Sequence, residues 1–513
     1  QVLQEVPNAR LLLVGFGGFR EHIEGMLSAM AANDVDAFIA HGKAGPADGA
    51  PFLDPCGDEL RAMFRPLTAD QRARVTATGI LKHEQLGELL PLASLCVVGS
   101  KAAEAFGMVT VEAMSAGVLP LSNDHSGLSD VLRAVEAARP DLCDVMKLET
   151  RSGGSHGTAD GNYFCEILPR KIVDALHFMY PNGFDDQTRR LELARELREV
   201  VVEKFAWDGL CTQLLQPLDK FEASVPNDAA VQAAPTVRNP DSQHICVVHG
   251  YILAGTGSNI YSVNLAMTWK KQGHAVTAVC QDREAASYDY VDEFFMGTDN
   301  IPTTPPKPGT LRVVVPDIDD LLPVYVFDRY EGYTVKTIPD CTEAEIENHI
   351  TKTAEGIKRV LAQGCDRVLS NHALLSPVNT KRACEEYGVP FDIKIHGSGI
   401  TFVLKPHPQY KKYTIEAIEA CEKVVCGTQY IVDYMKETFK DEYDELNLAD
   451  KMVIVPPGMD PDVFNLAESH EANQERFRAK VAAFIEDSGS KGRVASKIML
   501  PATWSPEPPN HMH

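Results

Sequence analysis

Basic residues are scarce in this sequence relative to acidic ones. There are 49 Lys and Arg against 72 Asp and Glu among 513 residues, which gives a formal net charge of −23. Nucleic-acid backbones are bound by an excess of Lys and Arg, so this balance argues against a nucleic-acid partner. The sequence also lacks any apolar run near the ~20 residues that cross a bilayer, so we expect no integral membrane segment.

Closely spaced cysteine pairs are also missing. None of the 12 cysteines forms a Cys-x-x-Cys pair, and the nearest two are Cys421 and Cys426. Scattered cysteines within apolar stretches are typical of buried free thiols in a reducing compartment. The pattern therefore predicts a cytoplasmic protein, with zinc sites or disulfides as the alternative.

Short apolar segments alternate with helical patterns along most of the chain, which is the signature of parallel α/β sheets. The strands expected in the first part are residues 11–15, 75–81, 95–99 and 118–122. Those expected in the second part are residues 244–249, 275–280, 311–315, 367–370, 391–395, 423–426 and 452–455. Residues 222–242 lose this periodicity and are rich in Ala, Pro, Asn and Asp, which indicates a linker.

The first candidate site lies in residues 95–117. An apolar strand is followed by a turn at Gly107 and then by a helical run, with Glu104 before the turn and Glu112 after it. The first backbone N–H groups of a helix have no partner within it, so this arrangement forms a cradle for an anion. A carboxylate on each side of bound phosphates suits recognition of the hydroxyls of a sugar nucleotide. Glu112 lies among apolar residues and is expected to be buried.

A second candidate site is the glycine loop after the strand at residues 244–249. Glycines there permit positive φ angles and let a ligand approach the main chain. We expect Gly255, Thr256 and Gly257 to contact a diphosphate or an acceptor, with Ser258 or Asn259 capping the following helix. The alternative is a tight strand–helix turn without a ligand.

Two histidines follow predicted strands, where α/β sheets place their ligands. His396 precedes Gly397 and Ser398, and His372 occurs in a similar setting. His396 is expected to hydrogen-bond the sugar or the reaction centre. His372 is a weaker acceptor-side candidate, because isolated histidines are more often structural.

Residues 104–117 resemble the two-glutamate motif of the retaining glycosyltransferases of family 4, which have the GT-B fold. The resemblance continues through residues 2–17 and 123–131, which correspond to the donor lobe. The acceptor lobe is recognisable in residues 248–261, 394–398 and 455–464. In that family the acceptor lobe comes first, whereas here the donor lobe does.

The resemblance implies two Rossmann-like lobes in permuted or tandem-fragment order. The donor-binding lobe is expected at residues 1–221 and the acceptor-binding lobe at residues 243–470, joined by the linker at 222–242. Residues 471–513 are expected to be a tail, and residues 497–500 within it resemble the first strand of a donor lobe. The chain is thus either a circular permutant or a window from a tandem array with flanking glycosyltransferase lobes.

The implied activity is transfer of a hexose from a nucleoside diphosphate sugar to a hydroxyl acceptor, with retention of configuration. Glu104 and His396 would be the catalytic residues, and Glu112 would hold the ribose. Backbone groups of Phe106, Gly107 and Met108 would face the phosphates. Neither a metal nor a cofactor is implied, and the acidic run at residues 317–320 is interpreted as structural.

One departure from the family supports a different class of function. The basic residue that clasps the diphosphate in the family's first donor-lobe loop has no counterpart here. The alternative is therefore a catalytically silent module that binds sugar nucleotides or acts as a scaffold. A dinucleotide-binding enzyme using Gly255, with Asp282 as its acidic residue, is disfavoured by the glycine spacing.

Overall fold

The computed structural model describes most of the chain. The described residues are 2–15, 20–44, 60–62, 64–79, 81, 83–100, 102–149, 161–218, 242–255, 257–326, 330–466, 475–476 and 479. Two compact units emerge from the packing of the backbone. The first comprises Gln1–Ser94, Glu166–Gln187 and Val463–His513, and the second comprises Leu95–Cys165 and Thr188–Asp462.

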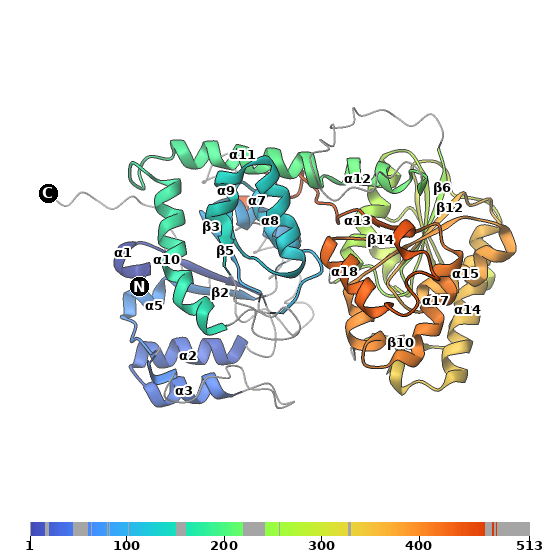
Figure 1. The fold of residues 1–513 in the computed structure, drawn as a ribbon, viewed down its shortest axis with the longest axis horizontal. Coiled ribbons are helices and arrows are strands. Elements are labelled where there is room, and N and C mark those ends of the chain that lie inside the picture. The colour runs from blue at the N-terminus through green and yellow to red at the C-terminus, as the bar shows by residue number, and fades with distance from the viewer. Residues whose placement is uncertain are drawn as a thin grey trace. The chain divides into compact units, whose positions relative to one another are not determined.

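The second unit contains an eight-stranded sheet that is parallel throughout (Figure 1). Its strand order is β15-β14-β13-β12-β6-β7-β9-β8. The strands are β6 (His244–Val248), β7 (Ala275–Val279), β8 (Glu293–Met296), β9 (Leu311–Val315), β12 (Arg367–Asn371), β13 (Phe391–Lys394), β14 (Lys423–Cys426) and β15 (Met452–Ile454). The chain leaves β6 toward β7 on one side and later returns beside it with β12. The carboxyl ends of β6 and β12 therefore flank a topological switch point, where such sheets bind ligands.

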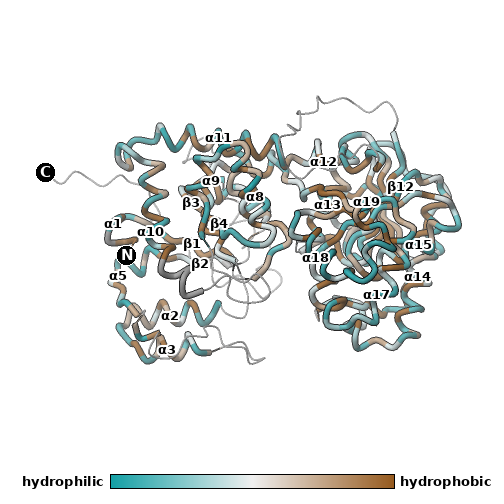
Figure 2. Tube along the Cα trace, viewed as in Figure 1, coloured by the Kyte–Doolittle hydropathy of each residue, from teal (hydrophilic) through white to brown (hydrophobic). Residues whose placement is uncertain are grey.

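Each face of this sheet is covered by helices. Successive side chains of a strand point to opposite faces, so Cys246 and Val248 pack into one core while Ile245 and Val247 pack into the other. The helices on the first face are α14 (Glu343–Leu361), α15 (Ser376–Tyr387), α17 (Lys411–Ala420) and α18 (Gln429–Thr438). Those on the second face are α12 (Trp207–Leu214) and α13 (Gly257–Lys271). Figure 2 shows hydrophobic residues concentrated on the strands and hydrophilic ones on the outer helices.

Shorter elements complete this part of the unit. They are η3 (Ala285–Ser287), η4 (Thr298–Asn300), β10 (Leu321–Val324), β11 (Thr334–Thr337), η5 (Ile338–Asp340), α16 (Gly397–Gly399), η6 (Ile400–Leu404), η7 (Pro408–Tyr410) and α19 (Leu448–Lys451). Strands β10 and β11 form a separate parallel pair.

The second unit also contains a three-stranded parallel sheet that carries the Glu104 loop. Its strands are β3 (Leu95–Val98), β4 (Leu119–Asn123) and β5 (Lys147–Leu148), in that order. Its helices are α7 (Met108–Ser115), α8 (Ser126–Ala138), α9 (Pro140–Met146) and α11 (Thr188–Phe205). Every residue of the central strand β4 is buried, which makes this strand the core of the sheet.

The first unit contains a two-stranded parallel sheet of β1 (Leu11–Val14) and β2 (Val75–Gly79). Its helices are α1 (Val2–Glu5), α2 (Arg20–Ala32), α3 (Val35–Lys43), α5 (Ala69–Ala73), α6 (His83–Leu89), η1 (Leu90–Leu92) and most of α10 (Gly161–Met179). Helices α2 and α3 pack through a small apolar cluster that includes Ala29, Phe38 and Leu60.

The mixed α/β architecture with parallel sheets confirms the predicted fold class. All eleven predicted strands are present, with ends that shift by at most two residues. Strands β5, β8, β10 and β11 were not predicted, since they have two to four residues and no clear pattern. No helix within the described ranges is both long and apolar enough to span a bilayer.

The predicted lobe boundaries at residues 221, 243 and 470 stay predictions. Most of the expected linker, residues 222–241, lies outside the described residues. So does most of the expected tail at 471–513, including the strand proposed for residues 497–500.

Candidate functional site

Glu104 lies in the loop between β3 and α7, and its backbone is held by the start of α8. The Glu104 N–H donates to Ser126 Oγ at 2.9 Å, and the Gly127 N–H donates to the Glu104 carbonyl at 2.9 Å. The Ser100 hydroxyl donates a short hydrogen bond to Glu104 Oε1. The carboxylate is therefore oriented by its own loop while remaining partly accessible.

Gly107 makes the turn into α7 as the sequence predicts. Its φ is +99°, a left-handed conformation that side chains rarely adopt. A Cβ at this position would lie 2.2 Å from Leu128 Cδ2, so α8 packs directly against the turn. Helix α7 begins at Met108, and the residues predicted to face phosphates therefore surround its N-terminus.

Glu112 is buried in the middle of α7, with 3% of its surface exposed. Burial raises the pKa of its carboxyl group to about 7. The sequence expectation of a buried carboxylate is thus confirmed. Such a group binds hydroxyl donors strongly because charge in a low-dielectric interior is otherwise costly.

The glycine loop follows β6 as predicted. Gly255 is exposed with φ +113°, and α13 begins at Gly257, while Thr256 lies outside the described residues. The expectation that Ser258 or Asn259 caps the helix is wrong, because both residues lie inside it. Asn259 instead donates to the Ala254 carbonyl at 2.7 Å and contacts His249 Nε2 at 2.8 Å.

Three histidines follow the carboxyl ends of the adjacent strands β6, β12 and β13. The ring of His372 lies between those of His249 and His396, with centroid distances of 5.2 and 5.0 Å. His396 Nε2 lies 3.0 Å from Asn371 Oδ1, and its ring contacts that of Tyr261. His249 was not singled out from the sequence, although its place directly after β6 matches that of His372.

His372 is the unusual member of this row. It has φ +75° and is 3% exposed, and among the residues that the structure describes neither ring nitrogen has a hydrogen-bond partner. Burial lowers the pKa of all three histidines, to about 4 for His249 and well below the ordinary value for His372 and His396. The row is therefore neutral at pH 7. Asn259 and Ser262 engage both nitrogens of His249, and Asn371 engages Nε2 of His396. His372 is thus the member that can offer one donor and one acceptor to a hydroxyl.

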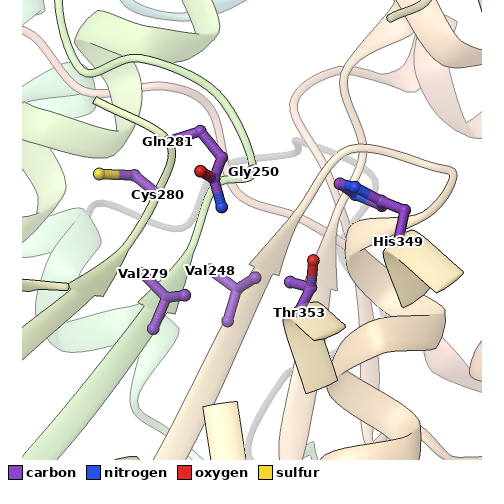
Figure 3. Close-up of a pocket in the computed structure, with 7 residues that line it drawn as sticks. All are labelled: Val248, Gly250, Val279, Cys280, Gln281, His349 and Thr353. Atoms are coloured by element: carbon purple, nitrogen blue, oxygen red, sulfur yellow. The ribbon is translucent and has the colours of Figure 1, made fainter. Parts of the chain in front are cut away.

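A small cavity lies at the ends of β6 and β7 (Figure 3). Its lining includes Val248, Gln281 and two side chains of α14, His349 and Thr353. His349 Nδ1 and Thr353 Oγ1 are buried and have no hydrogen-bond partner in the described part of the chain. The cavity holds about one water molecule, so it is too small for a sugar.

Two sets of hydrogen bonds join the Glu104 loop and α8 to the eight-stranded sheet within the second unit. Thr428, two residues after β14, donates from Oγ1 to the Ala105 carbonyl at 2.9 Å. Asp130 of α8 accepts from the backbone N–H groups of Gln429 and Tyr430, at 3.2 and 3.3 Å. Neither Thr428 nor Asp130 was identified from the sequence.

These contacts bring the two predicted site regions near the same sheet edge. Thr428 follows β14 as His396 follows the neighbouring strand β13. Adjacent strands lie about 4.8 Å apart, so β14 and β6 are separated by roughly 15 Å. Within the described part of the chain, no group of three or more His, Cys, Asp or Glu side chains is arranged to bind a metal ion.

Comparison with known families gives one result for this region. Residues 58–138 match the family model described as glycosyl transferases group 1. The matched segment contains β3, the Glu104 loop, all of α7 and all of α8. No curated protein matches the chain. The family match supports a glycosyltransferase, and the parallel α/β sheets are those expected of the Rossmann-like GT-B fold.

Proposed function

We propose that the protein is a retaining glycosyltransferase that moves a hexose from a nucleoside diphosphate sugar to a hydroxyl acceptor. The observation that carries this proposal is the Glu104 loop within the matched segment, next to the left-handed Gly107 and the N-terminus of α7. A helix N-terminus after a strand and a glycine turn stabilises phosphates. The retaining outcome and the hexose rest on the family resemblance.

The donor would be held mainly by α7 and its loop. The backbone of Phe106, Gly107 and Met108 would face the diphosphate, and buried Glu112 would accept hydrogen bonds from the ribose. Glu104 would contact the donor sugar and stabilise positive charge as the glycosidic bond breaks. The protein has a net charge of −23, so backbone amides suit an anionic donor better than the general surface does.

The acceptor would bind at the carboxyl edge of the eight-stranded sheet. His396 would hydrogen-bond the transferred sugar or the reaction centre, and Gly255, Thr256 and Gly257 would contact the diphosphate or the acceptor. Support comes from the switch point between β6 and β12 and from the neutral histidine row beside it.

The proposed chemistry is front-face substitution. The leaving diphosphate helps to deprotonate the acceptor hydroxyl, which attacks the anomeric carbon from the side that the diphosphate leaves. Amides near α7 stabilise the charge that develops on the phosphate oxygens. We propose no metal or cofactor for this reaction, and a cytoplasmic location in keeping with the scattered thiols.

Donor turnover tests the proposal. The purified chain is incubated with UDP-glucose, GDP-mannose or ADP-glucose, and release of the nucleoside diphosphate is measured. Glu104→Gln should lower turnover at least ~100-fold, because a fixed charge at the reaction centre is lost. Glu136→Gln, at an exposed position on α8, is the matched control and should turn over donor like the native protein.

The same experiment distinguishes an active transferase from a catalytically silent binding module. Suppose that the native protein and Glu104→Gln both bind donor but release no nucleoside diphosphate. This result would contradict the proposed transferase activity and support a binding module. The anomeric configuration of a glycosylated product, read by proton NMR, would decide between retention and inversion.

A further inference from the structure

The peptide between Ala105 and Phe106 packs closely against the start of α8. A Cβ on Gly127 would lie 2.4 Å from the carbonyl carbon and oxygen of Ala105 and 2.5 Å from the Phe106 nitrogen. Only glycine allows α8 to pack this closely against the peptide. The same carbonyl accepts the hydrogen bond from Thr428 Oγ1 at 2.9 Å. The peptide is thus held by backbone packing and by one side chain from the neighbouring sheet.

A hydrogen bond to the Ala105 carbonyl also determines where the Phe106 amide points. The peptide group is planar and trans, so its C=O and N–H point in opposite directions. Fixing the carbonyl toward Thr428 therefore directs the Phe106 N–H away from Thr428. Accepting a hydrogen bond at the carbonyl also polarises the amide and makes its N–H a stronger donor.

Thr428 is itself held in place. It is 1% exposed, and its Oγ1 accepts from the Ile431 N–H at 3.2 Å as the N-cap of α18. The Asp130 carboxylate accepts from the next two amides, those of Gln429 and Tyr430. A carboxylate at a helix N-terminus is stabilised by the helix dipole, so Asp130 secures α18 against α8. The hydroxyl of Thr428 is therefore kept on the Ala105 carbonyl.

We propose that Thr428 is a positioning residue for the donor: through the Ala105 carbonyl it orients the Phe106 amide toward the donor diphosphate. This inference rests on the proposed function, in which the α7 N-terminus binds the phosphates. It adds a residue that lies outside the donor loop in sequence, because Thr428 follows Ala105 by 323 positions. Thr428 touches neither the sugar nor the reacting atoms in this proposal.

The test compares the affinity of a nucleoside diphosphate with that of its parent nucleoside. UDP, GDP and ADP, with uridine, guanosine and adenosine, are titrated into the full chain by calorimetry or ligand-observed NMR. Thr428→Val keeps the shape of the side chain but removes the hydroxyl. It should weaken diphosphate binding about five-fold, the effect of one neutral hydrogen bond, and leave nucleoside binding unchanged. Thr428→Ser should restore diphosphate affinity.

Thr428→Val also removes the N-cap hydrogen bond of α18, and a second variant serves as the control for that loss. Thr342 caps α14 in the same way, accepting from the Glu345 N–H at 3.2 Å. Thr342→Val should therefore lower thermal stability as Thr428→Val does, while diphosphate affinity stays at the native value. This separates a positioning effect from a general effect of capping.

Several results would overturn the inference. Native diphosphate affinity in Thr428→Val, or an equal loss for diphosphate and nucleoside, would show that Thr428 does not orient a phosphate-binding amide. A native protein that binds none of the three diphosphates would instead remove the proposed function, and the inference with it.

Discussion

His249 and His372 stack at the carboxyl edge of the eight-stranded sheet, with ring centroids 5.2 Å apart and planes inclined by 29°. They follow β6 and β12, the strands that flank the switch point. Burial favours the neutral form of both rings, and protonation of both would place like charges side by side in a poorly solvated interior. The folded state therefore binds protons at His249 and His372 less readily than the unfolded chain does.

Buried histidines should make stability depend on pH, and His349 offers the clearest test. Burial lowers its pKa to about 4. The unfolded chain takes up a proton below about pH 6.5, whereas the folded chain does not. The stabilisation is fully present above pH 6.5 and is lost as the pH falls toward 4. Between pH 6.5 and 5, His349 should account for about 2 kcal/mol of lost unfolding free energy.

Urea unfolding at pH 7, 6 and 5 measures this contribution. His349→Leu should show a shallower decline than the native protein. Equal declines in both proteins would mean that His349 is protonated in the folded state at pH 5.

Glu112→Gln should stabilise the protein while impairing donor binding. Burial raises the pKa of Glu112 to about 7, so between about pH 4.5 and 7 the folded state retains a proton that the unfolded chain has released. Stability falls as the pH rises through this window. At pH 8 the substitution should add up to roughly 3 kcal/mol, because the buried charge is removed. Melting temperatures of both proteins at pH 5 and 8 check this, and a gain of equal size at both pH values would contradict it.

Gly127→Ala should disturb the contact between α8 and the Ala105–Phe106 peptide. The added methyl group would lie 2.4 Å from backbone atoms that cannot move without shifting the Glu104 loop. Overpacking of this kind should cost about 1–3 kcal/mol of unfolding free energy, measured in urea. Gly257→Ala is the matched control, because a Cβ there meets nothing within 4 Å. A similar cost in both variants would show that the contact at Gly127 is not tight.

Lys423→Met should destabilise the second unit. Lys423 Nζ is fully buried, lies 3.3 Å from Asp392 Oδ2, and donates to the carbonyls of Leu214 and Gln216. Arg367 Nη1 remains on Asp392 Oδ2 at 2.7 Å, so the carboxylate keeps one partner while two backbone carbonyls lose theirs. Loss of the buried charge-assisted hydrogen bonds should cost about 1–3 kcal/mol. Denaturant unfolding should show no comparable change for Lys412→Met, whose side chain is 55% exposed. A loss below 1 kcal/mol for Lys423→Met would mean that Arg367 alone compensates Asp392 and that Lys423 contributes little.

Local patterns in the sequence were enough to predict much of this architecture. Apolar segments between helical patterns located the principal strands, and the strand–glycine–helix arrangement located Glu104, Gly107 and Glu112. The prediction that Ser258 or Asn259 caps α13 was wrong, because the helix begins at Gly257 and the Asn259 side chain hydrogen-bonds His249. The spacing of residues in a sequence does not show which buried group a polar side chain will hydrogen-bond.

The contacts of Thr428 and Asp130 could not be predicted for a different reason. They join residues about 300 positions apart. Thr428 lies in no motif, and the resemblance of residues 123–131 to the family does not indicate what Asp130 contacts. Only the packing of α8 against α18 brings them together. Such tertiary pairings leave no periodic signal in a single sequence, although they determine how the donor loop is supported.

The single pairing of strand β1 affects how easily the first unit unfolds locally. Within the described residues β1 pairs with β2 alone, and Leu11 and Val14 are 50% and 46% exposed. Parallel strands are ordinarily covered on both faces, and two strands by themselves are marginal. Amide protons of β1 should therefore exchange with deuterated solvent well before those of β6 or β12. We therefore expect β1 to unfold locally at a lower free energy than the strands of the large sheet.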